Sequence, residues 1–249
     1  MNQKRSSWRL PIPSAASTRS VRVGSPVAPE ESRLASLAVV LAHRIRGLVT
    51  GIEGYTDLLI DSLGSKEQRE TALRILESAV RIERVLADLQ RYSDPVEPVL
   101  RPTQLRSLMG ELLVAVEDED LERIRFDLKP IDQVELEIDP MLMLQALLIL
   151  VQNALDATRN GGSVLLSATV DPRENQTYFK VHNEGLIDIV DAETTVFSPF
   201  YTTKAHNLGV GLAIARRIIV AHGGTLHLTT NSVEDGTCFS IKLPFILQS

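Results

Sequence analysis

The sequence predicts an α+β protein in which a long helical hairpin precedes an α/β sandwich. Before residue 94, apolar residues recur in alternating steps of three and four along two long segments, which is the spacing of paired helices. After a proline-rich stretch, strand-like segments alternate with shorter apolar helical segments. That second pattern is typical of a sheet covered by helices.

The first predicted helix begins near Ser32 and carries an unbroken heptad seam. The seam residues are Leu34, Ala38, Leu41, Ile45, Leu48, Ile52, Tyr55 and Leu59. Gly64 interrupts the pattern, and Ser65-Lys66-Glu67-Gln68 is a capping-box signature for a second helix. The second helix repeats the spacing through Ala72, Ile75, Ala79, Ile82, Leu86 and Leu89. Because one hairpin buries only part of such a stripe, we expect a homodimer whose two hairpins form a four-helix bundle.

Prolines at 95, 98 and 102 end the second helix and mark a linker, residues 95–102. The hairpin is therefore expected at residues 31–94 and the sandwich at 103–249. Within the sandwich, helices are predicted at 105–116 and 141–157, the second opened by Asp139 as N-cap and Pro140 in the first turn. Strands are predicted at 124–128, 134–138, 163–170, 177–181, 225–229 and 237–243. We expect them to form an antiparallel sheet with helices on one face.

Composition limits the classes of function. The net charge of −6 gives no indication of direct nucleic-acid binding. Residues 1–30 carry five basic side chains and one acid among many Ser and Pro residues, which predicts a disordered basic tail, with an organellar transit peptide as the alternative. No apolar run reaches the length expected of a membrane span. The single cysteine, Cys238, is expected to fill a strand core in a reducing compartment, so a cytoplasmic location is predicted.

The most specific motif lies in the last fifty residues. Phe197-Ser198-Pro199-Phe200-Tyr201-Thr202-Thr203-Lys204 precedes a glycine-rich segment, Leu208-Gly209-Val210-Gly211-Leu212-Ala213, and then an apolar helix. Glycines allow the backbone to approach a phosphate, and the N-terminus of the following helix directs free N–H groups at an anion. Upstream, Asn153 lies inside an otherwise apolar helix. Together these segments predict a nucleotide-binding site.

With this set of motifs, the chain resembles bacterial two-component sensor histidine kinases over roughly residues 31–245. Its C-terminal part resembles the ATP-binding sandwich (the Bergerat or GHKL fold) of gyrase, the Hsp90 chaperones and the mismatch-repair ATPases. The resemblance implies an ATP-dependent protein histidine kinase that uses Mg²⁺. Such an enzyme would phosphorylate its own histidine and pass the phosphoryl group to an aspartate in the receiver domain of a separate response regulator.

His43 is the phosphoacceptor that the resemblance implies. Taken alone, a histidine at an outer heptad position is more often a solvated surface residue, but Leu41-Ala42-His43-Arg44-Ile45-Arg46 resembles the family's phosphoacceptor box. The family usually places a carboxylate directly after this histidine, and here Arg44 takes that place. Losing a positioned general base lowers a rate by about 10²–10⁴-fold, although a cation also favours neutral imidazole and attracts phosphate. Gly47 replaces the family's Thr or Asn, so little phosphatase activity is expected.

The resemblance also assigns residues of the nucleotide site. Asn153 corresponds to the asparagine that coordinates Mg²⁺, whereas the polar residue often found one turn earlier is Ile149 here. Asn183 stands where the family has an aspartate that accepts a hydrogen bond from the adenine amino group, and Gly185 is kept while Ile187 replaces the second glycine of that box.

The segment around the predicted lid supplies the remaining nucleotide-binding residues. These are Thr202, Thr203, Lys204, Gly209, Gly211 and Leu212, with Lys204 as counter-charge to phosphate and the two glycines along the triphosphate. The lid itself, residues 205–208, is unusually short. Arg216 and Arg217 are expected to be solvated, and His222 is expected to be a helix-end residue without a ligand role.

Two alternatives to an active kinase remain. Arg44 and Ile149 favour a degenerate kinase-like protein that acts as a histidine phosphotransferase or dimeric scaffold without autokinase activity. A different ATPase of the same superfamily, such as an anti-sigma-factor kinase or a chaperone, is disfavoured by the heptad hairpin that carries His43.

Overall fold

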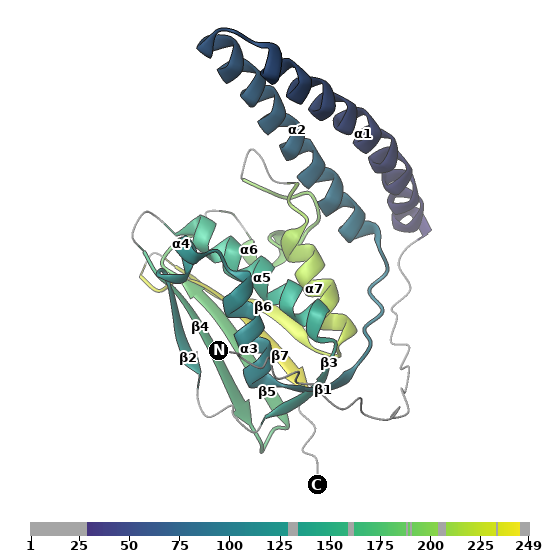
Figure 1. Cartoon of the computed structure of the whole chain (residues 1–249). Coiled ribbons are helices and arrows are strands. Elements are labelled where there is room, and N and C mark those ends of the chain that lie inside the picture. Colours follow the sequence, from purple (N-terminus) through teal and green to yellow (C-terminus); the bar gives the residue numbers. More distant parts are fainter. Residues whose placement is uncertain are drawn as a thin grey trace, which may run out of the picture.

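The computed structural model describes residues 29–128, 134–158, 162–187, 189, 191–203, 208–232 and 234–244, without the side chains of 29–44 and 61. A long helical hairpin projects from a layered domain in which helices lie on a sheet (Figure 1). The α+β class predicted from the sequence is therefore confirmed.

The hairpin consists of α1 (Pro29–Ser62) and α2 (Lys66–Ser93). Ser65 is the N-cap of α2, and its hydroxyl accepts a hydrogen bond from the Gln68 N–H at 3.1 Å, as the capping signature predicts. The helix ends at Ser93, and the backbone of Asp94 is already extended ahead of Pro95.

The contact between the two helices differs from the predicted seam of α1. Among the side chains of α1 that the structure describes, Val49 and Thr56 are buried, and each follows a seam residue directly in the sequence. In α2 the predicted seam positions Ala72, Ala79 and Leu86 are buried, whereas Ile75 and Ile82 of the same seam are exposed. Five predicted seam residues of α1 are exposed: Ile45, Leu48, Ile52, Tyr55 and Leu59. The hairpin thus has an exposed apolar face in addition to the buried face between its two helices. A heptad pattern alone does not show which apolar residues belong to which face.

The main sheet has five strands in the order β2-β4-β5-β7-β6. Their bounds are Ile124–Leu128 (β2), Val164–Asp171 (β4), Gln176–Asn183 (β5), Gly236–Pro244 (β7) and Thr225–Ser232 (β6). The expectation of a purely antiparallel sheet is wrong, because β2 pairs with β4 in parallel. This pairing is possible because the chain crosses over through α5 between these strands.

A second, two-stranded sheet was not predicted. It pairs β1 (Arg101–Gln104) with β3 (Glu135–Ile138) in antiparallel register. Pro102 was part of the predicted linker. A strand that pairs with only one neighbour tolerates proline, because the N–H groups along its other edge have no strand to bond. The strand therefore begins inside the segment that the prolines predicted to be linker.

The helices of the sandwich are α3 (Leu105–Ala115), α4 (Asp118–Leu121), α5 (Pro140–Ala157), α6 (Ala192–Thr195) and α7 (Gly211–Ala221). Asp139 caps α5 as predicted, because its Oδ1 accepts hydrogen bonds from the N–H groups of Met141 and Leu142, both at 3.1 Å. Helix α5 packs against α7, α3 and β5, so the core lies between it and the sheet.

Helix α5 is long and apolar enough, by length and composition, to cross a membrane, and the prediction that no apolar run reaches that length is wrong for this segment. In the structure, however, Met143, Leu147, Leu150 and Ala154 are fully buried in the core of the sandwich. Core burial on more than one side accounts for the apolar composition of this helix.

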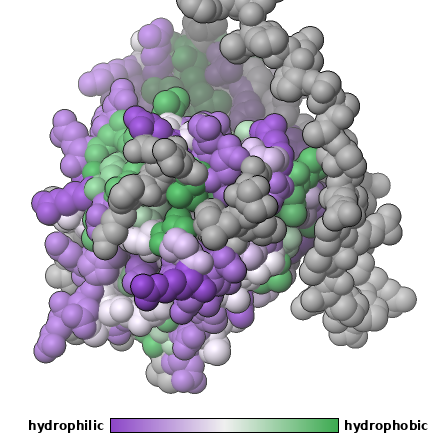
Figure 2. Space-filling view, turned by 90° about the horizontal axis from the view of Figure 1, so that it is seen from below, coloured by the Kyte–Doolittle hydropathy of each residue, from purple (hydrophilic) through white to green (hydrophobic). Residues whose placement is uncertain are grey.

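Large apolar side chains are unevenly exposed on the surface. On the face shown in Figure 2, hydrophobic residues form separate patches among hydrophilic ones. In the described part of the chain, more than half of the exposed large apolar side chains belong to the hairpin. The hairpin is thus the main apolar surface that this single chain leaves open.

The hairpin is attached to the sandwich through Arg217 of α7. Its guanidinium donates hydrogen bonds to the carbonyls of Tyr92 and Asp94, the second at 3.0 Å, and its Cζ lies 5.4 Å from the centre of the Tyr92 ring. The Tyr92 ring also meets Phe200 edge-on at 5.7 Å between centroids. The expectation that Arg217 is only solvated is therefore wrong, since it holds the end of α2 against the sandwich.

His222, the residue that ends α7, joins three segments. The N–H of Asp139 donates to His222 Nε2 at 3.0 Å, and His222 Nδ1 lies 2.7 Å from the Ile218 carbonyl, to which it donates. The Val99 N–H in turn donates to Asp139 Oδ2 at 3.0 Å. The imidazole is thus held in its neutral form with Nδ1 protonated, and it links α7 to the cap of α5 and the linker.

The first prediction follows from the titration of His222. Burial lowers the pKa of His222 from its ordinary value of 6.5, because desolvation disfavours the charged ring. As the pH falls, the unfolded state therefore binds a proton at a higher pH than the folded state does. The stability that neutral His222 contributes is fully present above about pH 6.5 and is lost as the pH falls through the folded-state pKa. We expect the free energy of unfolding, measured in urea, to decrease between about pH 7.5 and 5.5 by more in the wild type than in His222→Leu.

The same variant should be less stable than the wild type at neutral pH by about 1–3 kcal/mol, because the Asp139 N–H loses its acceptor. His227→Gln, at an exposed histidine of β6, is the control and should keep the wild-type pH dependence. Equal pH dependence in the wild type and His222→Leu would contradict the assignment.

Candidate functional site

One face of α5 joins the two glycine segments that the sequence singled out. A Cβ placed on Gly211 would lie 3.3 Å from Ile149 Cγ2, and a Cβ on Gly185 would lie 2.3 Å from the Ala157 carbonyl oxygen. Ile149, Asn153 and Ala157 are spaced by four residues and share a helix face. Asn153, half-buried, therefore lies between the two glycine segments, as the predicted site requires.

Asn183 is the last residue of β5, with only 1% of its surface exposed. Its Nδ2 is buried and has no hydrogen-bond partner among the described residues. An unsatisfied buried donor costs about 1–3 kcal/mol, so this amide is a candidate ligand contact. It stands on the face of β5 that points to the helices, because its neighbours Val181 and Phe179 at alternate positions are also buried.

The loop after Asn183 is fixed by two residues that the sequence analysis missed. Thr237 Oγ1 donates to the Gly185 carbonyl at 2.7 Å. The Asn231 side chain accepts from the Ile187 N–H at 2.9 Å and donates to the Ile187 carbonyl at 2.8 Å. Thr237 pairs directly with Asn183 in the β5–β7 register, so only the strand pairing shows that these residues support the loop.

The segment before the predicted lid is tied to the segment after it. Gly209 has a φ of +72°, and a Cβ there would lie 2.4 Å from the Tyr201 carbonyl oxygen. Only glycine fits this contact without strain. Thr202 and Thr203 follow Tyr201 directly and are exposed, whereas Lys204 lies outside the described residues.

Phe197 anchors the aromatic corner ahead of this segment. It is buried and meets Phe239 of β7 edge-on, with 6.0 Å between ring centroids. Arg216 Cζ lies 5.1 Å from the centre of the Phe197 ring, so Arg216 is not merely solvated as predicted. The aromatic corner therefore positions Thr202 and Thr203, which follow it in the chain, relative to the sheet.

Helix α7 begins at Gly211 with an N-terminus suited to an anion. Its N-cap, Val210, provides no side-chain hydrogen bond to the first turn. Leu212, half-buried, packs against the hydrophobic core and so orients this turn. The uncapped helix N-terminus, the glycine contacts and the unpaired Asn183 amide together fit a nucleoside triphosphate.

A metal ion in this site would depend on the phosphates for most of its ligands. Within the described ranges, no group of three or more His, Cys, Asp and Glu residues could hold a metal. Mg²⁺ commonly binds through one or two protein oxygens together with phosphate oxygens and water. The Asn153 amide fits that arrangement.

His43 and Arg44 lie on α1, and their side chains are outside the described part of the structure. Arg46, about one turn further on, donates to Gln90 Oε1 of α2 at 3.1 Å. Because the two helices run antiparallel, the turn that carries His43 lies beside the C-terminal end of α2. This is the end that Arg217 and Phe200 hold against the sandwich.

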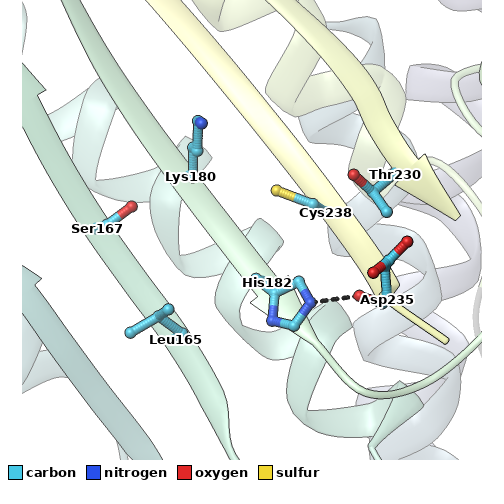
Figure 3. Close-up of a pocket in the computed structure, with 7 residues that line it drawn as sticks. All are labelled: Leu165, Ser167, Lys180, His182, Thr230, Asp235 and Cys238. Atoms are coloured by element: carbon cyan, nitrogen blue, oxygen red, sulfur yellow. Dashed lines mark hydrogen bonds between the residues drawn. The ribbon is translucent and has the colours of Figure 1, made fainter.

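A separate pocket of about 390 Å³ lies on the other face of the sheet (Figure 3). It is lined by Leu165, Ser167, Lys180, His182, Thr230, Asp235 and Cys238. His182 alternates with Asn183 along β5, so the two side chains point to opposite faces. The predicted nucleotide residues do not line this pocket, and we therefore place the candidate site between α5, α7 and the loop after β5.

Fold and site together define a GHKL-type ATP-binding domain attached to a helical hairpin. Residues 138–247 match the family model for the histidine kinase-, DNA gyrase B- and HSP90-like ATPase, and residues 34–97 match the His Kinase A (phospho-acceptor) domain. Together these two matches cover most of the chain. The chain therefore belongs to the two-component sensor histidine kinases.

Known relatives agree with this assignment. The chain is 28% identical over 224 residues to the signal transduction histidine-protein kinase AtoS of Escherichia coli (strain K12), covering 86% of this chain and 36% of AtoS. The histidine kinase ThkA, solved in complex with the response regulator protein TrrA, superposes with a TM-score of 0.63 at 26% identity over 87% of this chain and 63% of ThkA. Full-length ShkA in complex with AMPPNP shares the fold, with a TM-score of 0.68 at 24% identity over 90% of this chain and 47% of ShkA. The chain spans between about a third and a half of the length of the curated relatives it matches.

The second prediction tests the contact between Gly185 and α5. In Gly185→Ala the new Cβ would overlap the Ala157 carbonyl oxygen and approach Asn183 Nδ2, so the loop must move. We expect a loss of about 1–3 kcal/mol in the free energy of unfolding, as for other overpacked sites, and weaker AMPPNP binding by calorimetry.

Gly64→Ala is the matched control, because a Cβ at Gly64 meets nothing within 4 Å. It should leave both stability and nucleotide affinity near the wild-type values. Wild-type nucleotide affinity in Gly185→Ala would show that the loop does not belong to the site.

Proposed function

We propose that this chain is an ATP-dependent protein histidine kinase that phosphorylates His43 and then transfers the phosphoryl group to an aspartate of a separate response regulator. The observation that carries the proposal is the placement of Asn153 between Gly185 and Gly211 along α5. The family match of the hairpin that carries His43 supports the same activity. When bound, Mg·ATP supplies the phosphoryl group and the metal that neutralises its charge.

The residues of the sandwich divide this task. Asn153 would hold the metal through its amide oxygen, and Asn183 would contact the purine. The N–H groups at the start of α7 receive the phosphates, which Gly209 and Gly211 allow to approach closely. Thr202, Thr203 and Lys204 then complete the phosphate contacts from the lid side. Leu212 fixes the first turn of α7 by packing against the hydrophobic core.

On the hairpin, His43 acts as the nucleophile through a neutral ring nitrogen. Arg44 attracts the phosphate and disfavours protonation of the imidazole, in the place where the family has a general base. The structure of ThkA with TrrA supports a response regulator receiver domain as the partner of this chain, which would then act in the cytoplasm. We assign residues 31–94 to dimerisation and phosphotransfer and residues 103–249 to ATP binding.

A second candidate function is a phosphotransferase or scaffold without autokinase activity. Ile149 favours it, because its side chain lies beside Gly211, where the family often has a polar group. An aliphatic side chain there cannot orient water or metal.

The third prediction separates the two functions. After incubation with Mg²⁺ and γ-³²P-ATP, the purified wild type should carry acid-labile, alkali-stable label, and His43→Gln should carry none. His227→Gln, at an exposed histidine of the sandwich, should be labelled like the wild type. A wild type that binds AMPPNP but stays unlabelled would favour the phosphotransferase or scaffold.

The fourth prediction concerns the dimer. The exposed apolar face of the hairpin includes Leu48 and Tyr55, whose side chains are 70% and 74% exposed in the single chain. We propose that a second copy covers this face and completes a four-helix bundle. By light scattering coupled to size exclusion, the wild type should be a dimer and the double variant Leu48→Glu/Tyr55→Glu a folded monomer.

Val114→Glu is the matched control for this experiment. Val114 is 87% exposed on α3, outside the hairpin, so a new carboxylate there should leave the dimer intact. A double variant that remains dimeric would exclude the proposed face.

A further inference from the structure

The Asn183 amide has an unsatisfied hydrogen-bond donor in a fixed environment. Its Nδ2 is buried and has no hydrogen-bond partner among the residues that the structure describes, and only 1% of the residue is exposed. Gly185 packs directly beside it, since a Cβ there would come 2.7 Å from Nδ2, and so only glycine leaves this donor unobstructed. The hydrogen bond from Thr237 to the Gly185 carbonyl holds that backbone in place. The amide therefore lies against a backbone segment that is itself held in place.

The chemistry of an amide differs from that of a carboxylate at one decisive point. A carboxylate only accepts hydrogen bonds, so it pairs with the 6-amino group of adenine and repels the 6-oxo group of hypoxanthine or guanine. An amide carries both an acceptor and a donor, and a half-turn about its Cβ–Cγ bond exchanges Oδ1 and Nδ2. It can therefore satisfy either substituent, and it carries no charge that would repel an oxo group.

We infer that Asn183 makes this nucleotide site tolerant of 6-oxopurine nucleoside triphosphates as well as ATP. The inference rests on the proposed function, in which Asn183 contacts the purine. A 6-oxo group would give Nδ2 the acceptor that the described part of the chain does not provide, and a 6-amino group would bind Oδ1 after rotation of the amide. The choice between the two purines is then set by small differences in solvation and not by charge repulsion.

Calorimetry on the full chain with Mg²⁺ tests this directly. The ligands are the β,γ-imido analogues of adenosine and inosine triphosphate, which differ only at the purine 6-position and the adjacent N1 proton. For the wild type, we expect the two dissociation constants to agree within about tenfold, a difference of about 1.4 kcal/mol or less. In Asn183→Asp, the inosine analogue should lose affinity relative to the adenosine analogue by a further tenfold or more, on the order of an unpaired buried polar group.

Asn175→Asp is the matched control, because it makes the same chemical change at an exposed turn between β4 and β5. It should keep the wild-type ratio of affinities. Thermal unfolding of each variant, and its affinity for the adenosine analogue, show whether Asn183→Asp keeps a folded site. If Asn183→Asp fails to bind either analogue, the wild-type ratio alone decides.

Two outcomes overturn the inference while leaving the kinase proposal intact. One is a wild type that binds the adenosine analogue more than about tenfold more tightly than the inosine analogue. The other is a ratio that Asn183→Asp does not change. A wild type that binds neither analogue would overturn both the inference and the proposed function.

Discussion

The site depends on the packing of α5 into the core of the sandwich. The buried side of this helix, including Met143, Leu147 and Leu150, fixes it against the sheet and α7. Its remaining face then has no freedom to move relative to the two glycine segments that approach Ile149 and Ala157. Rigid core packing therefore sets the distance between the two halves of the nucleotide site. Polar groups such as Asn153 lie where they do because apolar ones on the same helix are buried.

Helix α7 extends this constraint from the nucleotide site toward the hairpin. It starts at Gly211 within the candidate site and contacts the end of α2 through Arg217, and its C-cap residue, His222, lies beside the cap of α5. The linker is also held, because Val99 bonds to Asp139 and Asp94 bonds to Arg217. Both ends of the linker are thus attached to elements that surround the site. Movement of the hairpin relative to the sandwich would require these particular hydrogen bonds to break.

Features set by contacts within a few residues could be predicted from the sequence, whereas long-range pairings could not. Local signals were sufficient for the Ser65 and Asp139 caps, since an N-cap bonds within its own helical turn. The strands of the main sheet and β3 were also located, but β1 was not. The parallel pairing of β2 with β4 depends on a crossover that strand patterns do not reveal. Likewise, Arg217 was expected to be solvated because its partners, Tyr92 and Asp94, are more than a hundred residues away in the chain.

The sequence by itself determined the order of the longer helices and of the main-sheet strands, the heptad hairpin and the glycine, threonine and asparagine motifs, because these depend on residue type and short spacing. Only the tertiary structure decided which face of α1 stays exposed, which residues fix the loop after Asn183, and that the Asn183 donor is left unpaired. Those properties depend on strand register and on which buried side chains meet. Whether a buried polar group has a hydrogen-bond partner depends on residues that are distant in the sequence, and the segment that carries the group does not specify them.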